Sequence, residues 1–169
     1  MAVQTTYGGT MTARIAGQLA DSGFHDIVAM FNREDSAQMS FGRAVKFGST
    51  TDTTSAVLPT AETDIVAGIV IFSYEYAPGL DLGDDGILPD RPIQVLRKGR
   101  VIVELEDAVT IGQRGWVRAV ATGDELLGGV LPADDGTDTI DCTNQIVFLE
   151  SGATGDLVMV EVDFTNRPT

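Results

Sequence analysis

The chain offers few residues that could carry out covalent chemistry. Histidine occurs once, as His25, and cysteine occurs once, as Cys142. A Ser-His-Asp or Cys-His mechanism would therefore depend on His25, and a metal site with several histidine ligands is excluded. We interpret His25, which follows Phe24 near the N-terminus, as a surface or interface histidine. Cys142 has no basic neighbour in the sequence to lower the pKa of its thiol, so we expect no reactive thiolate.

Other catalytic and nucleotide-binding signatures are also missing from the sequence. It contains neither a glycine-rich loop ending in Gly-Lys-Ser/Thr nor a Gly-x-Gly-x-x-Gly motif after a strand. A carboxylate pair for glycoside hydrolysis is usually accompanied by aromatic platforms for the sugar, and the one tryptophan is Trp116. Because no nucleophile has a credible base, we predict that the protein is not an enzyme.

Two acidic clusters remain as candidates for metal chemistry. Calcium prefers several carboxylate and carbonyl oxygens on a loop that contains glycine, and both clusters contain glycine. Neither cluster has the alternating Asp-x-Asp-x-Asp-Gly spacing with a distal Glu, and charged runs in loops are usually solvated. We therefore expect no metal and no cofactor, with weak calcium candidates only. These candidates are Asp81, Asp84, Asp85 and Asp90 in the first cluster, and Asp134, Asp135, Asp138 and Asp141 in the second.

The charge of the chain narrows the choice of partners. The 169 residues carry a formal net charge of −14, whereas nucleic acids bind proteins through Lys and Arg side chains that neutralise phosphates. We therefore expect no nucleic acid partner; the acidity fits either an outward-facing surface or solubility alone. No apolar run approaches the roughly 18 residues of a membrane helix, and the N-terminus does not resemble a signal peptide, so no membrane partner is expected. A single cysteine fits synthesis in a reducing cytoplasm.

Alternating apolar residues predict that the chain is mainly β. In the last predicted strand Val158, Val160 and Val162 share one face, while Glu161 and Asp163 share the other. Such half-buried strands favour antiparallel sheets, and their number fits a β-sandwich or a jelly-roll-like or barrel-like domain. Eight strands are predicted, over residues 26–32, 39–47, 66–76, 93–96, 100–106, 115–120, 145–149 and 157–164.

Glycine-rich and polar stretches predict the connections between these strands. Arg97-Lys98-Gly99 has the composition of a tight hairpin between two strands. The longer polar stretches 49–64, 78–92 and 122–143 are predicted to be surface loops, which are a second choice for contacts with a partner.

The first part of the chain differs from the rest. Residues 1–38 are predicted to form an extended N-terminal arm, and residues 39–169 a single β-domain. Residues 13–20 have the spacing of two helical turns, with Ile15 and Leu19 on one face, although Gly17 weakens such a helix by up to about 1 kcal/mol. If about 25 residues were extended they would reach on the order of 80 Å, onto a neighbouring subunit. The alternative is a disordered or self-packed terminus.

The order of motifs along the chain resembles a known family. The motifs are Gly-Arg-Ala-Val at residues 42–45, Leu-Pro at 58–59, Ala-Gly-Ile at 67–69, and Arg-Lys-Gly-Arg followed by Val-Glu-Leu-Glu-Asp within 97–107. In these motifs and their order, the chain resembles the small cement or decoration proteins that tailed bacteriophages add to their capsids. The resemblance covers most of the chain and implies a β-rich structural protein without an enzymatic step.

The resemblance also implies a location and partners. It implies a virion protein, made in the host bacterial cytoplasm, that binds the outer surface of the head across major capsid protein subunits, stabilises the head and self-associates as a dimer or trimer. Apolar residues of the arm and basic residues of the predicted hairpin are the candidate partner-binding residues, namely Ile15, Leu19, Phe24, Arg97, Lys98 and Arg100. The hairpin tip could equally be solvated. The alternative function is a calcium-dependent carbohydrate- or surface-binding β-domain.

Overall fold

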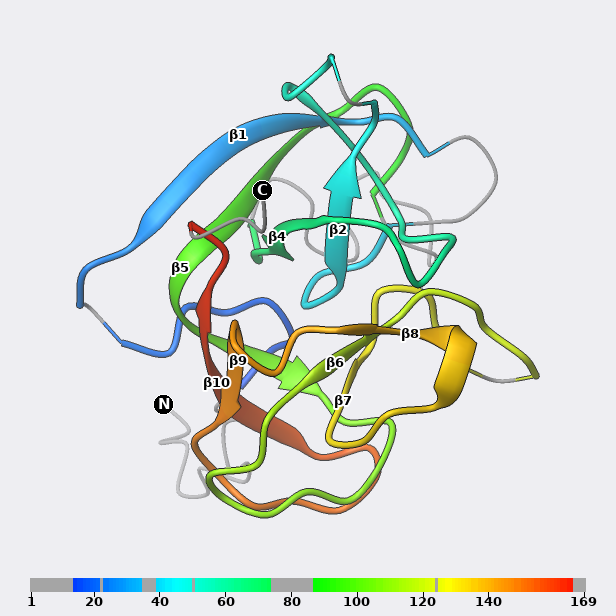
Figure 1. Cartoon of the computed structure of the whole chain (residues 1–169). Coiled ribbons are helices and arrows are strands. Elements are labelled where there is room, and N and C mark those ends of the chain that lie inside the picture. Colours follow the sequence, from blue (N-terminus) through cyan, green and yellow to red (C-terminus); the bar gives the residue numbers. More distant parts are fainter. Residues whose placement is uncertain are drawn as a thin grey trace, which may run out of the picture.

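The computed structural model describes residues 14–21, 23–34, 39–49, 51–73, 87–123 and 125–165. These residues form ten strands and one 3₁₀ turn at Gly136–Asp138, and no α-helix occurs among them. The prediction of a mainly β chain is therefore confirmed (Figure 1). The strands are β1 (Asp26–Asn32), β2 (Ala44–Phe47), β3 (Ser55–Val57), β4 (Val66–Val70), β5 (Pro92–Glu104), β6 (Trp116–Arg118), β7 (Val130–Leu131), β8 (Thr139–Asp141), β9 (Ile146–Phe148) and β10 (Leu157–Asp163).

Five strands close into a barrel. They follow the order β1-β3-β2-β4-β5, and β1 pairs again with β5, so the sheet returns to its first strand. The pair β1–β3 is parallel and the other pairs are antiparallel. Closure leaves these strands without a free edge over the paired residues, which removes a site of unwanted strand addition. Of the predicted alternatives, the barrel-like domain describes this part of the fold.

Strand β5 continues beyond the barrel. Its first half pairs with β1 and β4, and its second half pairs with β10, whose other neighbour is β9. The predicted hairpin at Arg97-Lys98-Gly99 is therefore wrong, because the strand runs on through these residues. Gly99 lies where the strand changes partners and has a φ of 140°. A Cβ atom there would come within 2.6 Å of the His25 ring, so glycine permits close packing rather than a turn.

A smaller sheet of three strands, in the order β7-β6-β8, packs beside the barrel (Figure 1). Three short strands, β3, β7 and β8, lie in stretches that were predicted to be surface loops, and the loop prediction is wrong at these residues. Strands of two or three residues are too short to show alternation. They form because they pair with residues distant in the sequence, as Asp141 of β8 pairs with Trp116 of β6.

Two hydrophobic cores lie on opposite sides of the barrel wall. All five residues of β4 are buried because the strand separates the two cores. Ala67 and Val70 belong to the core inside the barrel, whereas Val66 and Ile69 belong to the core between the barrel and the outer strands. The inner core also contains Met30, Met39, Val45, Ala56, Leu58, Ile87, Ile93 and Val95, and the outer core includes Leu96, Val101, Val103, Leu105, Val117, Ile140, Cys142, Ile146, Phe148, Val158, Val160, Val162 and Phe164.

The described part of the N-terminal region lies along β5. The amide of Gly17 donates to the carbonyl of Ile102 (2.8 Å), and the amide of Ala20 donates to the carbonyl of Arg100 (3.0 Å). The helical turns predicted over residues 13–20 are therefore wrong for residues 14–20. Strand β1 lies inside the range predicted as an arm and is part of the barrel. Residues 1–13 lie outside the described residues, so for them the arm stays a prediction.

Within the described ranges, we find no helix that is long and apolar enough to span a membrane.

Candidate partner-binding surface

Three of the predicted partner-binding residues line one hollow. It has a volume of about 400 Å³ and lies over the paired strands β5 and β10, where Phe24, Lys98 and Arg100 meet. The pairing explains the arrangement, because Lys98 is opposite Asp163 and Arg100 is opposite Glu161 in the ladder. Residues two apart point to the same side of a strand, so both basic side chains face this hollow.

The basic side chains in this hollow are already paired with carboxylates. The Lys98 Nζ atom lies 2.6 Å from Asp163 Oδ2, and Arg100 bonds both Glu161 (2.9 Å) and Asp21 (3.1 Å). The hydrogen bond from Lys98 lowers the pKa of Asp163 to about 2, with a further contribution from the Thr165 hydroxyl. The hollow is therefore a polar surface on which both basic side chains are paired, rather than a free basic patch.

Phe24 is the most exposed large apolar side chain of this region. Its exposed fraction is 83%, while the neighbouring His25 packs against Gly99. Ile15 is also exposed, but Leu19 packs against the outer core. Arg97 lies on the opposite side of β5 from Lys98 and is 3.6 Å from Asp26. The structure thus brings together Phe24, Lys98 and Arg100 and separates them from Arg97.

Two exposed apolar residues on β1 were not among the residues predicted to bind a partner. Ile27 and Phe31 point outward, while Met30 and Asn32 are buried. The Arg33 guanidinium lies 5.8 Å from the centre of the Phe31 ring, within the range of a cation–π contact. The period-two pattern of the strand was visible in the sequence, but both of its faces carry apolar residues, so the pattern could not show which face is exposed.

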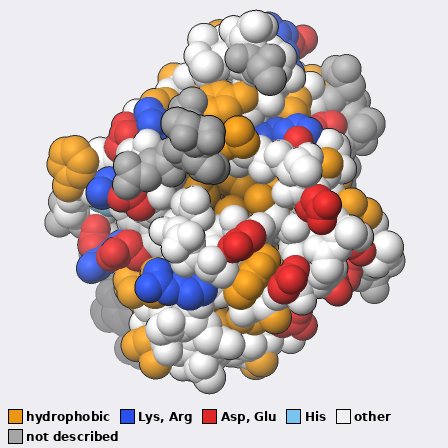
Figure 2. All heavy atoms as spheres, in the orientation of Figure 1, with side chains coloured by type: hydrophobic (Ala, Val, Ile, Leu, Met, Phe, Trp, Pro, Cys, Tyr) orange, Lys and Arg blue, Asp and Glu red, His pale blue; other side chains and the backbone are white. Residues whose placement is uncertain are grey.

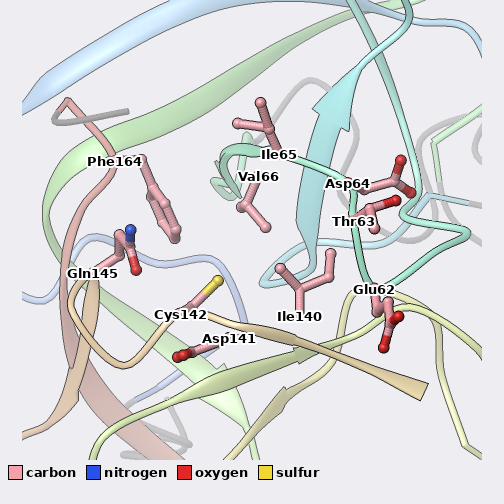
Figure 3. Close-up of a pocket in the computed structure, with 10 residues that line it drawn as sticks. All are labelled: Glu62, Thr63, Asp64, Ile65, Val66, Ile140, Asp141, Cys142, Gln145 and Phe164. Atoms are coloured by element: carbon pink, nitrogen blue, oxygen red, sulfur yellow. The ribbon is translucent and has the colours of Figure 1, made fainter. Parts of the chain in front are cut away.

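A second hollow lies between β8 and the loop that precedes β4. It has a volume of about 240 Å³, and Figure 3 shows Glu62–Val66 on one side with Cys142, Gln145 and Phe164 on the other. Its rim includes the exposed residues Glu62, Thr63, Ile65 and Asp141, and its floor includes the buried residues Val66, Ile140, Cys142 and Phe164. Figure 2 shows hydrophobic side chains inside a hollow on this face, with acidic side chains on the surface around it.

Cys142 contributes to the floor of this second hollow and has no disulfide partner. Burial, followed by the nearby charge of Asp141, raises the pKa of its thiol to about 12. The thiol is therefore protonated at neutral pH, which agrees with the expectation that no reactive thiolate is present.

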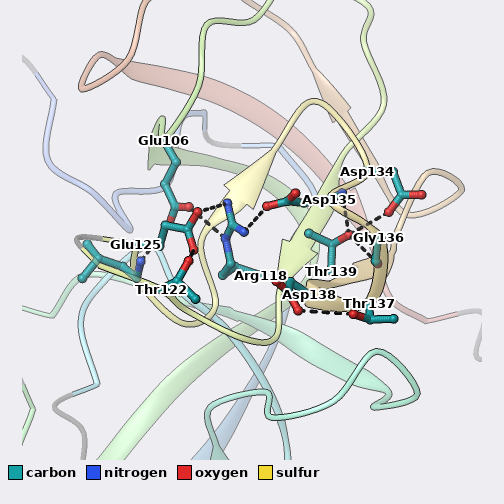
Figure 4. Close-up of polar contacts among 11 residues, drawn as sticks. Glu106, Arg118, Thr122, Glu125, Asp134, Asp135, Gly136, Thr137, Asp138 and Thr139 are labelled. Atoms are coloured by element: carbon teal, nitrogen blue, oxygen red, sulfur yellow. Dashed lines mark hydrogen bonds and ion pairs between the residues drawn. The ribbon is translucent and has the colours of Figure 1, made fainter.

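One member of the second acidic cluster, Asp135, belongs to an internal ion-pair network, and Asp134 and Asp138 accept hydrogen bonds from threonine hydroxyls (Figure 4). Asp135 lies 2.6 Å from Arg118, and Asp134 accepts a hydrogen bond from the Thr139 hydroxyl (2.9 Å). Asp138 accepts a hydrogen bond from Thr137 (3.4 Å). Across the described part of the chain, no group of three or more His, Cys, Asp or Glu side chains is arranged to hold a metal ion. Asp81, Asp84 and Asp85 lie outside the described residues.

Arg118 is the centre of this network. Its side chain is 4% exposed and also contacts Glu106 (3.3 Å) and Glu125 (3.2 Å). Glu106 is shared with Arg43, at 3.4 Å. Burial alone would lower the pKa of Arg118, but the bond to Asp135 and the charges of Glu106 and Glu125 raise it above its ordinary value. The network therefore holds the small sheet against the end of β5.

The surface thus has paired charges and exposed apolar side chains, and its one cysteine is buried. Comparison with known families agrees with a structural role. The sequence model described as "Structural cement protein (E217 gp24/Pam3 gp6)" matches residues 3–163. The chain belongs to the phage structural cement protein family. It is a bacteriophage capsid cement protein, it associates with capsid proteins, and it is a component of the virion.

A chain of one solved phage capsid is similar in fold to this cement protein. A chain of "The capsid of Myoviridae Phage XM1" has a TM-score of 0.68 and 20% identity, and the match covers 96% of this chain and 98% of that chain. A chain of "The crystal structure of head fiber gp8.5 N base in bacteriophage phi29" has a TM-score of 0.39 and 17% identity, with coverage of 85% and 100%. Among curated protein sequences, none matches the cement protein significantly.

Proposed function

We propose that this cement protein binds the outer surface of the phage head across seams between major capsid protein subunits and raises the resistance of the head to rupture. The family membership supports the cement role. The net charge of −14 supports an outward position, because the genome-facing surface would place the protein against phosphates. No catalytic step is proposed, since Cys142 is buried and protonated and His25 packs against Gly99.

The observation that carries the binding proposal is the exposure of Phe24. An aromatic side chain that is 83% exposed beside a hollow whose basic side chains are already paired has the character of an interface anchor. Ile15, Ile27 and Phe31 add exposed apolar surface on the same N-terminal part of the chain. In this proposal Lys98 and Arg100 keep the hollow in shape through their internal ion pairs, and Leu19 anchors the segment to its own core.

The N-terminal arm is proposed to extend the contact to a neighbouring subunit. Its described base is fixed, because Arg14 donates to Glu150 (2.7 Å) and Gly17 pairs with β5. If the residues before Arg14 are extended, each adds roughly 3.3 Å of reach. The arm is proposed to use this reach to contact the neighbouring subunit. Symmetric self-association as a dimer or trimer is part of the proposal.

Co-sedimentation with phage heads that lack the cement protein tests this function. The wild-type protein should bind saturably and raise the temperature at which the heads rupture. Phe24→Ala should bind at least about tenfold more weakly, as expected for an aromatic anchor. Ile111→Ala removes an apolar side chain that is 69% exposed on a different turn, and it should bind as the wild type does. Failure of the wild-type protein to bind heads would contradict the proposed function. Normal binding by Phe24→Ala would show that Phe24 is not an anchor of the interface.

A further inference from the structure

Strand β1 has an open edge along its first half. Its pairing with β3 is limited to Phe31 and Asn32, whereas on its other side it pairs with β5 from Asp26 to Phe31. Figure 1 shows the ribbon of β1 at the upper left margin of the molecule. The barrel is therefore closed on the β3 side at one end of β1 only, and residues 27–29 lie at an edge.

The hydrogen bonds of β1 show which backbone groups face this edge. In an antiparallel ladder, the backbone groups of successive residues face the partner strand and away from it in turn. The amide of Asn32 donates to the carbonyl just before β5 (2.9 Å), whereas the amide of Phe31 donates away from β5, to the carbonyl of Thr54 (2.8 Å). By this alternation the backbone groups of Ile27 and Ala29 also face away from β5. Neither has a backbone partner among the described residues.

The side chains along this edge are apolar and exposed. Ile27 is 37% exposed and Phe31 is 47% exposed, and Ala29 between them is exposed as well. Proteins protect an open edge with lysine, proline or charged side chains, and residues 27–31 contain none of these. An unprotected apolar edge invites the addition of another strand, so we expect a strand to cover it in the assembled particle.

The segment that precedes the described residues has the composition of such a strand. Residues 1–13 contain no Asp, Glu, Lys or Arg, in a chain that has 25 acidic residues. Residues 2–7, with the sequence Ala-Val-Gln-Thr-Thr-Tyr, are rich in residue types that favour strands. In an extended conformation Val3 and Tyr7 share one face, which matches the apolar outer face of β1.

The direction of the chain favours an edge on another copy of the protein. Arg14 donates to the carbonyl of Leu157 (3.2 Å), which lies opposite the last residue of β5. Ile27 lies opposite Leu96, eight residues earlier in β5, so about 26 Å of strand separates it from this end. Residues 17–20 run along β5 from this end towards β1. An arm that continues this line backwards leads away from its own open edge and towards a neighbouring molecule.

The charge of the two segments suits a contact between two acidic copies. Each copy carries a net charge of −14, so acidic surfaces of two copies repel each other. The arm segment is neutral, and the segments 26–33 and 90–97 around the open edge contain three arginines and two aspartates. Addition of the arm to this edge therefore joins two copies at surfaces that are not acidic.

We propose that residues 2–7 of one copy of the cement protein add as a β-strand to the open edge of β1 in a second copy. This inference rests on the proposed function, because it names the neighbouring subunit that the arm contacts. The added strand pairs with the amides and carbonyls of Ile27 and Ala29, and its apolar face packs beside Ile27 and Phe31. Each copy donates one strand and receives one, and a closed ring of such exchanges gives the dimer or trimer.

Binding of edge and arm variants to heads that lack the cement protein tests the inference. Ala29→Pro removes the amide that faces the edge and leaves the bonds to β5 in place, as proline requires in an edge strand. Ala29→Pro, and separately deletion of residues 2–7, should each bind at least about tenfold more weakly than the wild type, because main-chain hydrogen bonds supply the affinity in strand addition. Ala29→Val is the matched control, since it keeps the amide with a side chain of similar size, and it should bind normally.

Circular dichroism checks that every variant is folded. The deletion removes no described residue, so it still tests the inference if Ala29→Pro does not fold.

Cross-linking on occupied heads identifies the receptor of the arm. Heads are filled with a mixture of two variants, Thr5→Cys and Ala29→Cys, one of which carries a tag, and are treated with a short bismaleimide. Cys142 does not compete, because it is buried and its thiol is protonated. A cross-link between the two variants supports the inference.

Absence of this cross-link, with both introduced cysteines accessible to maleimide, would overturn the inference. Normal head binding by both Ala29→Pro and the deletion variant would also overturn it. Failure of the wild-type protein to bind heads would instead remove the proposed function, so the two failures are distinguishable.

Discussion

Replacement of Arg118 by Met tests whether the network at the end of β5 stabilises the fold. Met keeps an unbranched stem in the buried site and removes the guanidinium group. The change leaves Glu106, whose side chain is 14% exposed, with Arg43 at 3.4 Å as its remaining cation. Glu125 and Asp135 lose Arg118 as well, but Asp135 is 58% exposed and can be solvated.

The cost follows from the burial of these groups. Removing one partner of a buried ion pair costs about 3–5 kcal/mol, whereas exposed pairs contribute about 0–1 kcal/mol. Because Glu106 keeps Arg43, we expect Arg118→Met to lower the free energy of unfolding by about 3 kcal/mol, the low end of the buried range. For a domain of this size each kcal/mol shifts Tm by about 2–4 °C, so Tm should fall by about 6–12 °C.

Differential scanning calorimetry measures the change in Tm, and a double-mutant cycle with Glu106→Gln isolates the pair. The double variant should lose less stability than the sum of the two single losses, with a coupling of at least about 1 kcal/mol. Arg114→Met is the control, because Arg114 has no carboxylate partner among the described residues, and it should leave Tm almost unchanged. A fall in Tm of less than about 2 °C for Arg118→Met would refute the assigned role of the network.

Two further predictions concern titratable groups. The folded-state pKa of Asp163 is about 2, below the ordinary value near 3.9, so its pairing with Lys98 stabilises the fold above about pH 4, and this stability is lost as the pH falls towards 2. Asp163→Asn should therefore flatten the decrease in Tm between about pH 4 and pH 2, and an unchanged slope, equal to that of Asp107→Asn, would contradict this. Because the thiol of Cys142 is buried with a pKa of about 12, iodoacetamide at pH 8 should label the unfolded protein but not the native one; equal labelling rates would contradict this burial.

The predicted strands agree with the structure where alternation is long. The predicted strand 26–32 coincides with β1, and the predicted strand 157–164 differs from β10 by one residue. In β10 the buried Val158, Val160 and Val162 alternate with more exposed residues. Such a pattern depends on the side chains of one strand, and local sequence is sufficient to predict it.

The predictions failed where the decisive contacts are distant in sequence. Gly99 follows two basic residues and has the local composition of a turn, yet β10 pairs with both sides of it and keeps β5 extended. β7 has two residues, and its place depends on pairing with β6. Closure of the barrel through β1 and β5 joins residues about seventy positions apart, such as Val28 and Val95. No local window contains both members of these pairs.

For the candidate site, too, some properties follow from the sequence alone and others depend on contacts between distant residues. A single histidine, a single cysteine and a net charge of −14 already argued against catalysis and nucleic acid binding, because these arguments depend only on which residues the chain contains. The motif order also indicated the cement family. The partner of each charged residue depends on its neighbours in space. Arg118 pairs with Asp135 and Glu106, and Lys98 pairs with Asp163, whereas Glu62 and Asp141 have no cationic partner among the described residues. Ion pairs act over a few ångströms, and folding brings distant parts of the chain within that range.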